Sequence, residues 1–93
     1  MFIAEASGNV VGFADICYAG QDVWELHLLA VHPNFRGQGI GSMLIGTIVS
    51  YVKRREGKVI TLSTNTNNKR AKEFYRKFGF AETYTIQHMD LRL

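Results

Sequence analysis

A glycine-rich stretch near the middle of the chain has the residue types of a phosphate-binding loop. It reads Arg36-Gly37-Gln38-Gly39-Ile40-Gly41-Ser42 and separates an apolar segment from an amphipathic one. Glycines let backbone N–H groups approach an anion closely, and the first turn of a helix leaves such groups without intrahelical partners. The helix dipole and the guanidinium of Arg36 add positive charge at the same place. Residues 36–42 therefore predict a site for a phosphate or pyrophosphate.

Two common phosphate motifs fit this stretch poorly. A P-loop requires a Lys-Ser or Lys-Thr pair after its last glycine, and the stretch has no such pair. The dinucleotide pattern G-x-G-x-x-G would start at Gly37, but Ser42 stands where the third glycine belongs. The acidic residue expected about 20 positions further on is also missing. A different phosphate-bearing ligand is therefore predicted.

Glu25 and His27 lie two residues apart in the apolar segment that precedes the loop. In a strand their side chains share one face, and either could accept a proton through water. Structural roles are the alternative, with Glu25 paired to a lysine and His27 satisfied within the fold. The single Cys17 is expected to be buried as a small apolar residue. No metal site is predicted, because His32 and His88 lack ligand-like spacing with His27 or Cys17.

The elements around these residues predict an α/β fold with a mixed, mostly antiparallel sheet. A hairpin is expected over residues 2–6 and 10–18, followed by strands at 23–31 and 59–64 and a closing strand at 83–93. A helix is expected from about residue 40 to 52, with a stripe of Ile40, Leu44, Ile48 and Val52. The order strand, helix, strand implies one right-handed parallel crossover. A second helix contains Ala71, Phe74, Tyr75 and Phe78, and Gly79 and Phe80 cap it.

Strict alternation through the strand at 23–31 predicts two faces. Glu25, His27, Leu29 and Val31 would lie on one face, and Trp24, Leu26, Leu28 and Ala30 on the other.

Composition limits the classes of function. The 93 residues are expected to form a single domain, 1–93, and 46% of them are hydrophobic. A formal charge of +3 suits an anionic ligand but is too small to argue for nucleic acid. Apolar runs fall short of the ~20 residues that span a bilayer, and the N-terminus lacks the layout of a signal peptide. A lone cysteine fits a reducing compartment, so we expect a cytoplasmic protein without membrane contact.

Two blocks of the sequence resemble the GNAT superfamily of N-acetyltransferases. The superfamily signature Gln/Arg-x-x-Gly-x-Gly/Ala corresponds to Arg36-Gly37-Gln38-Gly39-Ile40-Gly41, after the lead-in Leu29-Ala30-Val31-His32-Pro33. The second block, Asn68-Lys69-Arg70-Ala71-Lys72-Glu73-Phe74-Tyr75-Arg76-Lys77-Phe78-Gly79-Phe80, is similar to Asn-x-x-Ala-x-x-Phe-Tyr-x-Lys-x-Gly-Phe. The resemblance covers residues 10–80 and implies binding of acetyl-CoA, with the pyrophosphate on residues 36–42.

The resemblance also implies roles for other residues. The pantetheine arm would run along Leu29, Ala30 and Val31, where a backbone N–H near Leu29 or Ala30 would polarise the thioester. Asn68 would hydrogen-bond the cofactor arm. Tyr75 would protonate the departing thiolate, although its place on an apolar helical stripe also suits a core residue.

The implied reaction is acetyl transfer to a primary amine by direct attack in a ternary complex. Either Glu25 or His27 would first take a proton from the amine. The stretch Trp24-Glu25-Leu26-His27 is also similar to part of the aminoglycoside 6′-N-acetyltransferases, so an aminoglycoside-like amine is an alternative acceptor.

Superfamily members usually carry a strand and one or two helices ahead of the first hairpin, whereas this sequence starts at the hairpin. A non-catalytic acyl-CoA-binding or regulatory module is therefore an alternative, and a fragment or remnant with weakened activity is another. A sheet without its first strand exposes an edge, so a homodimer is expected, in which the second copy could complete the acceptor site.

Overall fold

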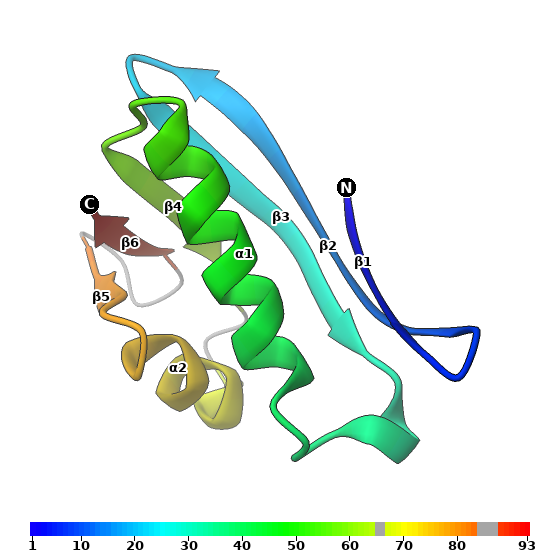
Figure 1. Cartoon of the computed structure of the whole chain (residues 1–93). Coiled ribbons are helices and arrows are strands. Elements are labelled where there is room, and N and C mark those ends of the chain that lie inside the picture. The colour runs from blue at the N-terminus through cyan, green and yellow to red at the C-terminus, as the bar shows by residue number, and fades with distance from the viewer. Residues whose placement is uncertain (65–66, 84–87) are drawn as a thin grey trace.

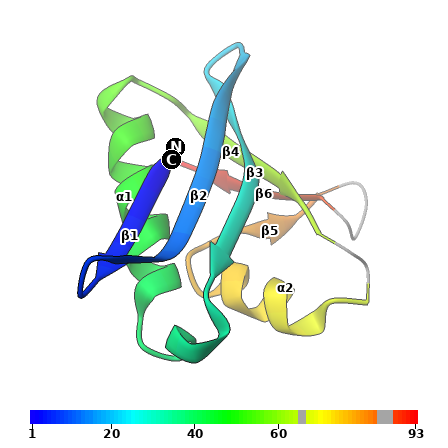
Figure 2. The same ribbon diagram turned by 90° about the vertical axis from the view of Figure 1, so that its right-hand side faces the viewer.

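The computed structural model describes residues 1–64, 67–83 and 88–93. In these residues six strands form one sheet in the order β1-β2-β3-β4-β6-β5, together with two α-helices (Figures 1 and 2). The elements are β1 (Phe2–Ala6), β2 (Asn9–Gly20), β3 (Val23–Val31), the 3₁₀ turn η1 (Pro33–Phe35), α1 (Ile40–Arg54), β4 (Val59–Ser63), α2 (Lys69–Arg76), β5 (Ala81–Glu82) and β6 (His88–Arg92). Only the β3–β4 pair is parallel among the described pairings, which confirms the predicted mixed α/β class.

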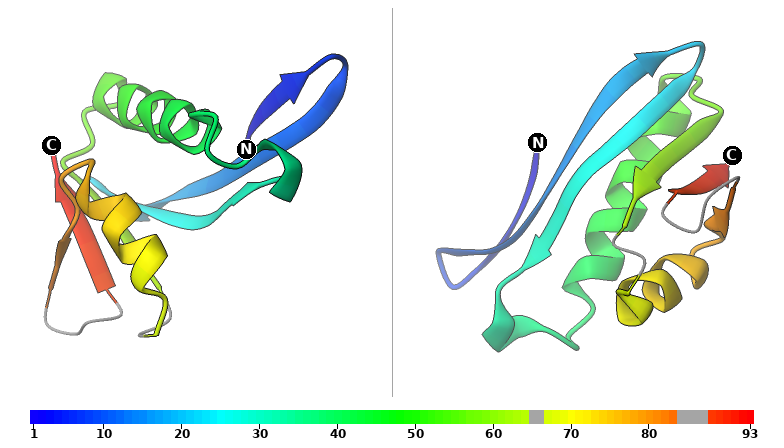
Figure 3. Two further views of the ribbon diagram at one scale, coloured as in Figure 1. Left: turned by 90° about the horizontal axis from the view of Figure 1, so that it is seen from below. Right: turned by 180° about the vertical axis from the view of Figure 1, so that it is seen from behind.

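α1 lies across one face of β1, β2 and β3 (Figure 3). Its buried stripe comprises Leu44, Ile45, Ile48 and Val52, as the period of 3.6 residues predicts. Burying each such side chain contributes about 1.5–3 kcal/mol, so this stripe is a main source of the core's stability. Among the described residues no helix is long and apolar enough to cross a membrane.

β3 and β4 are paired over only three positions and then separate. The pairs are Val23 with Val59, Trp24 with Ile60 and Glu25 with Thr61. Beyond Glu25 the two strands diverge, with β3 still paired to β2 and β4 to β6 (Figure 2). Among the described strands, the divergence leaves one edge of β3 without a strand neighbour where Leu29, Ala30 and Val31 lie.

A β-bulge at His27 divides β3 into two halves. Asp15 pairs with Leu28 whereas Ile16 pairs with Leu26, so His27 is an extra residue in β3. The predicted strict alternation is therefore wrong beyond His27. Leu29 turns toward the core, whereas Leu28 is 49% exposed on the opposite face.

Cys17 is exposed, contrary to the prediction that it is buried. It lies opposite Glu25 in the β2–β3 pair, and paired residues in antiparallel strands project from the same face. That face points away from the core, to which the neighbouring Leu26 contributes.

The C-terminal part departs from the single closing strand that was predicted over residues 83–93. The short strand β5 precedes it and pairs antiparallel with β6, whereas residues 84–87, within the predicted strand, lie outside the described residues. The predicted cap of the second helix is present. Gly79 adopts φ +96°, and Phe80 is buried against the ring of Tyr75 with centroids 5.5 Å apart.

Candidate active site

The start of α1 is open on its N-terminal side. Gly37 and Gly39 have left-handed φ values of +78° and +82°, which turn the chain from η1 into the helix without steric strain. Within the described residues no side chain caps the helix at Gly39, and its first turn holds no acidic residue. The first backbone N–H groups of α1 therefore point outward, as an anion site requires. Arg36 is exposed beside them, with its Nε 3.4 Å from the carbonyl oxygen of Val31.

A cleft of about 1090 Å³ extends from this helix start along α2. Its lining includes Leu29, Ala30, Val31, Arg36, Gly37, Gly39, Ile40, Gly41, Ser42, Asn68 and Tyr75. Every residue predicted for cofactor binding thus lies along one cleft except Gln38, whose amide nitrogen instead lies 3.5 Å from the carbonyl oxygen of Asn34. The volume suits a ligand larger than a single phosphate, since drug-sized ligands occupy clefts of roughly 300–1,000 Å³.

Gly41 has a packing role in addition to the one predicted for it. A Cβ atom at this position would lie 3.0 Å from Cζ of Phe74. The glycine therefore lets α2 approach the first turn of α1, and this close approach brings the two walls of the cleft together.

A second, smaller cavity occupies the space where β3 and β4 diverge. It measures about 400 Å³ and is lined by Glu25, Leu26, His27, Thr61, Leu62, Ser63 and His88. The bulged segment of β3 supplies one wall, and β4 with β6 supplies the other.

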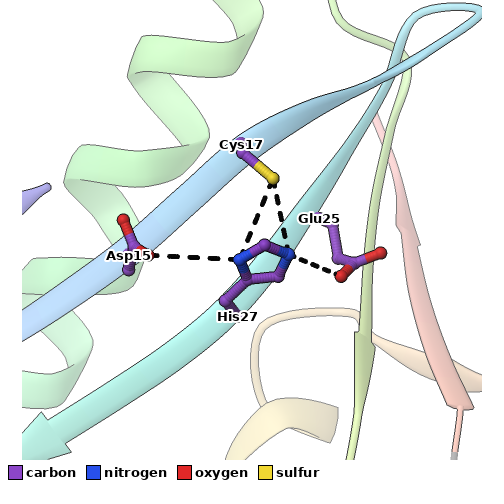
Figure 4. A network of polar contacts seen from close by, with 4 residues as sticks. All are labelled: Asp15, Cys17, Glu25 and His27. Carbon is purple, nitrogen blue, oxygen red and sulfur yellow. Dashed lines mark hydrogen bonds and ion pairs between the residues drawn. The ribbon is translucent and has the colours of Figure 1, made fainter.

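Glu25 and His27 meet directly, as their predicted common face requires. Oε1 of Glu25 lies 2.6 Å from Nε2 of His27, and both side chains are nearly half exposed (47% and 44%). At this distance the imidazole and the carboxylate can form a hydrogen bond, so the pair is able to pass a proton to or from a ligand. Asp15 lies 4.0 Å from Nδ1 of the same ring, and Sγ of Cys17 lies 3.4 Å from Nε2 (Figure 4).

Comparison with known proteins identifies the relatives of this chain. Residues 1–80 match the model of the acetyltransferase (GNAT) family. The chain belongs to the GNAT family.

An uncharacterized N-acetyltransferase of Methanocaldococcus jannaschii is 36% identical over 92 residues, which are 92% of this chain and 41% of that protein. The N-alpha-acetyltransferase RimI of Mycobacterium tuberculosis is 32% identical over 80 residues, 83% of this chain and 49% of that protein. The chain therefore spans less than half the length of either relative. The crystal structure of the PaiA N-acetyltransferase from Thermoplasma acidophilum, in complex with coenzyme A, shares the GNAT fold with a TM-score of 0.88 and 21% identity, covering 98% of this chain and 58% of that one.

In this GNAT domain Tyr75 projects from α2 into the larger cleft. It packs against the rings of Phe74 and Phe80, at centroid distances of 5.3 and 5.5 Å. Burial raises the pKa of the Tyr75 hydroxyl above its ordinary value of 10, because desolvation disfavours the phenolate. The hydroxyl therefore stays protonated throughout the neutral range. Its ring packs as a core residue would, and the role of general acid that the resemblance implies stays a prediction.

Asn68 caps α2 as well as lining the cleft. Its Oδ1 accepts a hydrogen bond from the backbone N–H of Ala71 at 3.1 Å. This bond uses the carbonyl oxygen of the amide, and the NH₂ group is the part that can donate to a ligand.

Several lining residues were not predicted from the sequence. The larger cleft also includes Phe35, Arg70, Ala71, Glu73, Phe74 and Lys77, and the smaller cavity includes Ser63 and His88. Arg70, Phe74 and Lys77 are spaced four and three residues apart, and Ala71 stands four residues before Tyr75; this helical spacing is the signal that could have identified them. Ser63 and His88 meet only because β4 pairs with β6, and no local pattern contains that register. The described residues contain no group of three or more His, Cys, Asp or Glu side chains arranged to hold a metal ion.

Proposed function

We propose that the chain binds acetyl-CoA in the cleft between the start of α1 and α2 and transfers its acetyl group to a primary amine. One observation carries this proposal. The open helix start, the unpaired edge of β3 and Tyr75 line a single cleft, and a separate polar cavity adjoins β3 where it leaves β4. A protein of the same fold has been solved in complex with coenzyme A, which supports the choice of ligand.

The chain's own residues supply the groups that coenzyme A needs. The N–H groups at residues 39–42 and the guanidinium of Arg36 bind the pyrophosphate. The unpaired edge of β3 at Leu29, Ala30 and Val31 offers backbone donors and acceptors to an extended ligand arm. Asn68 contributes its amide NH₂ group from the opposite wall.

Proton transfer is divided between the two ends of the site. Acetyl-CoA supplies an activated acyl group when bound. The Glu25–His27 pair accepts a proton from the acceptor ammonium, because an amine must be neutral before it attacks a carbonyl. A backbone N–H near Leu29 or Ala30 stabilises the developing oxyanion, and such a donor contributes about 3–4 kcal/mol.

Tyr75 acts on the leaving group. A thiol resembling a cysteine side chain has a pKa of about 8.5, which is about 1.5 units below that of tyrosine. Complete proton transfer from Tyr75 to a thiolate therefore costs at least about 2 kcal/mol, and burial of Tyr75 increases this cost. Tyr75 accordingly acts mainly as a hydrogen-bond donor to the thiolate. The attacking nitrogen gives its second proton to solvent as the amide forms, and the thiolate takes up a proton from solvent as coenzyme A leaves.

Thermal unfolding and thiol release test this proposal together. Coenzyme A or acetyl-CoA at millimolar concentration raises the Tm if the cleft binds it, because a ligand at 100 times its Kd stabilises the folded state by about 2.7 kcal/mol. Thiol release from acetyl-CoA with a panel of primary amines then measures turnover. An unchanged Tm at saturating ligand would refute the proposal at its first step.

The exposure of the acceptor side favours a second candidate function. Glu25 and His27 are nearly half exposed, so the smaller cavity is less enclosed than a typical catalytic pocket. A non-catalytic module that binds acyl-CoA would need the larger cleft alone. Binding without thiol release from any amine would support this candidate over the enzyme.

We also propose that the chain acts as a homodimer in the cytoplasm. β1 is an edge strand, and its Ile3 side chain is 55% exposed, so a second copy could cover it. Sedimentation at tens of micromolar tests the dimer, and a monomeric profile would exclude it at that concentration.

A further inference from the structure

We propose that Glu82 is a positioning residue for the reaction, which acts through α2 by holding the hydroxyl of Tyr75 in the larger cleft. Glu82 itself belongs to β5 and does not line that cleft. The inference rests on the proposed function, because it concerns how the chain places the group that acts on the thiolate.

Lys72 of α2 is a buried lysine. Its side chain is 7% exposed, and no other charged residue in the described part of the chain is buried to this extent. An ammonium group out of water is costly unless a negative charge lies close to it. The Nζ atom of Lys72 lies 4.0 Å from Oε1 of Glu82, which is within ion-pair distance. Glu82 therefore lowers the cost of burying Lys72, and it does so when this side of α2 faces β5.

Arg76 adds a second ion pair to the same carboxylate. Its Nη2 atom lies 2.6 Å from Oε1 of Glu82, and its side chain is 50% exposed. Residues four apart lie on one side of a helix, so Lys72 and Arg76 face β5 together. An exposed ion pair alone contributes little, but this carboxylate also faces a buried ammonium group, where solvent screens the charges less. Glu82 thus joins one side of α2 to β5 through two cations.

Phe74 holds the other side of α2. With 3.6 residues in a turn, Phe74 lies about 160° around the helix from Lys72. Its ring packs so close to Gly41 of α1 that a Cβ atom there would lie 3.0 Å from Cζ. α2 is only eight residues long, and these contacts on nearly opposite sides together restrict its rotation about its axis. Without the ion pairs to Glu82, one of the two constraints is lost.

Tyr75 lies between these two sides, so its position depends on the rotation of α2. It is about 60° from Lys72 and about 100° from Phe74 around the helix. A rotation of about 20° moves a group that lies about 5–6 Å from a helix axis by about 2 Å. A misplacement of about 1 Å can lower a rate about 100-fold. Glu82 therefore affects the reaction without touching the ligand, because it limits this rotation.

Two arginine variants compare the ion pair at Glu82 with a second ion pair elsewhere. Arg76→Gln removes a cation beside Glu82, whereas Arg92→Gln removes the cation of β6 that lies 3.8 Å from Asp90. Arg76→Lys keeps the charge, and Glu82→Gln removes the carboxylate. Every variant is also made together with Tyr75→Phe. Circular dichroism and Tm verify that each variant is folded, and Arg76→Gln is the test variant if Glu82→Gln is not.

Steady-state thiol release measures the effect on the reaction. Glu82→Gln should lower kcat about 10-fold, which corresponds to weakening one hydrogen bond to a charged group. The KM for the amine should change less than about 2-fold, because no α2 residue is among the described residues that line the smaller cavity. In the Tyr75→Phe background, Glu82→Gln should lower kcat by less than about 2-fold, since both residues act through one hydroxyl.

The arginine variants should separate the two ion pairs. Arg76→Gln should lower kcat in the same way as Glu82→Gln, and Arg76→Lys should retain most of the activity because it keeps a cation beside the carboxylate. The matched control Arg92→Gln should leave kcat and KM within about 2-fold of the parent chain, as expected for an exposed residue away from the cleft.

Titration of the Tyr75 hydroxyl gives a readout that does not depend on turnover. The ultraviolet absorbance of tyrosinate is followed against pH, and the same variant with Tyr75→Phe is subtracted. Removing the positive charge of Arg76 would by itself raise the pKa of a nearby phenol. If α2 rotates and Tyr75 becomes more exposed, its pKa falls instead toward the ordinary value of 10. We expect this fall in Arg76→Gln and not in Arg92→Gln.

An equal loss of kcat with and without the Tyr75 hydroxyl, an unchanged or raised pKa of Tyr75 in Arg76→Gln, or the same losses in Arg92→Gln would each overturn the inference. Failure of the proposed function gives a different result, which is an unchanged Tm with coenzyme A or no thiol release by the parent chain. In that case the titration alone decides whether Glu82 positions the hydroxyl. A fall of the Tyr75 pKa in Arg76→Gln supports the positioning role, and no fall refutes it.

Discussion

Alanine substitutions at two glycines of α1 test whether the contact between α1 and α2 shapes the larger cleft. A Cβ atom at Gly46 would meet nothing within 4 Å, whereas one at Gly41 would lie 3.0 Å from Cζ and 3.3 Å from Cε1 of Phe74. Both residues are helical, so both substitutions remove the conformational freedom of glycine from the unfolded chain. They differ in what the added methyl group meets.

The expected magnitudes follow from these contacts. Gly46→Ala should stabilise the protein by about 0.5–1 kcal/mol, the helix preference of alanine over glycine. Gly41→Ala gains at most the same amount, but its Cβ lies about 0.5–1 Å inside the optimal carbon–carbon separation of about 3.5–4.0 Å. Overpacking of this kind typically costs about 1–3 kcal/mol. Gly41→Ala should therefore be at least about 1 kcal/mol less stable than Gly46→Ala, a difference in Tm of about 4 °C or more for a domain of this size.

Urea and thermal unfolding measure the stabilities of the two variants. The change of Tm on adding coenzyme A measures how well the cleft binds this ligand. Because Phe74 and Gly41 both line that cleft, Gly41→Ala should also weaken the ligand-induced shift, whereas Gly46→Ala should not. Phe74→Leu combined with Gly41→Ala should recover part of the lost stability, since neighbouring substitutions are not additive. If Gly41→Ala stabilises the protein as much as Gly46→Ala, the contact between residue 41 and Phe74 does not limit how closely α1 and α2 pack.

Three further predictions concern other parts of the chain. Arg36→Ala should weaken coenzyme A binding about 10- to 100-fold, as expected for a charge-assisted hydrogen bond of about 1.5–3 kcal/mol, and a calorimetric titration with an unchanged Kd would contradict this role. The pKa of Tyr75 is raised in the folded state, so its contribution to stability is fully present below pH 10 and is lost as pH rises above 10 toward the folded-state pKa. Tyr75→Phe should remove this alkaline loss, as measured by unfolding between about pH 9 and 11, about 1 unit either side of the ordinary pKa of tyrosine, and it should slow thiol release in steady-state assays. The same alkaline slope in the variant would contradict the assignment. Gly57→Ala should destabilise the fold by about 3 kcal/mol, because its Cβ would overlap Cγ1 of Val52 and lie 2.8 Å from Cδ1 of Trp24, and a native Tm would show that this corner can relax.

Local sequence patterns predicted the parts of the site that depend on neighbouring residues. The stripe of Leu44, Ile48 and Val52 predicts α1 because a helix brings residues four apart onto one face. The open start of α1 was predictable because glycines stand where a capping side chain would be. The end of α2 was predictable because Gly79 readily adopts the left-handed conformation that ends a helix. These features are decided within one or two turns of chain, so the sequence alone contains them.

The tertiary structure decided which of these elements meet and which way their side chains face. The bulge at His27 reverses the alternation of β3, and it is a feature of the pairing of β3 with β2, which the residues of β3 alone do not record. The exposure of Cys17 follows from the same pairing, and Ser63 and His88 come together only through β4 and β6. Strand pairing joins residues that are far apart in the chain, and no short sequence window records it. The sequence by itself therefore determined the open start of α1, whereas the smaller cavity was determined by the register of the sheet.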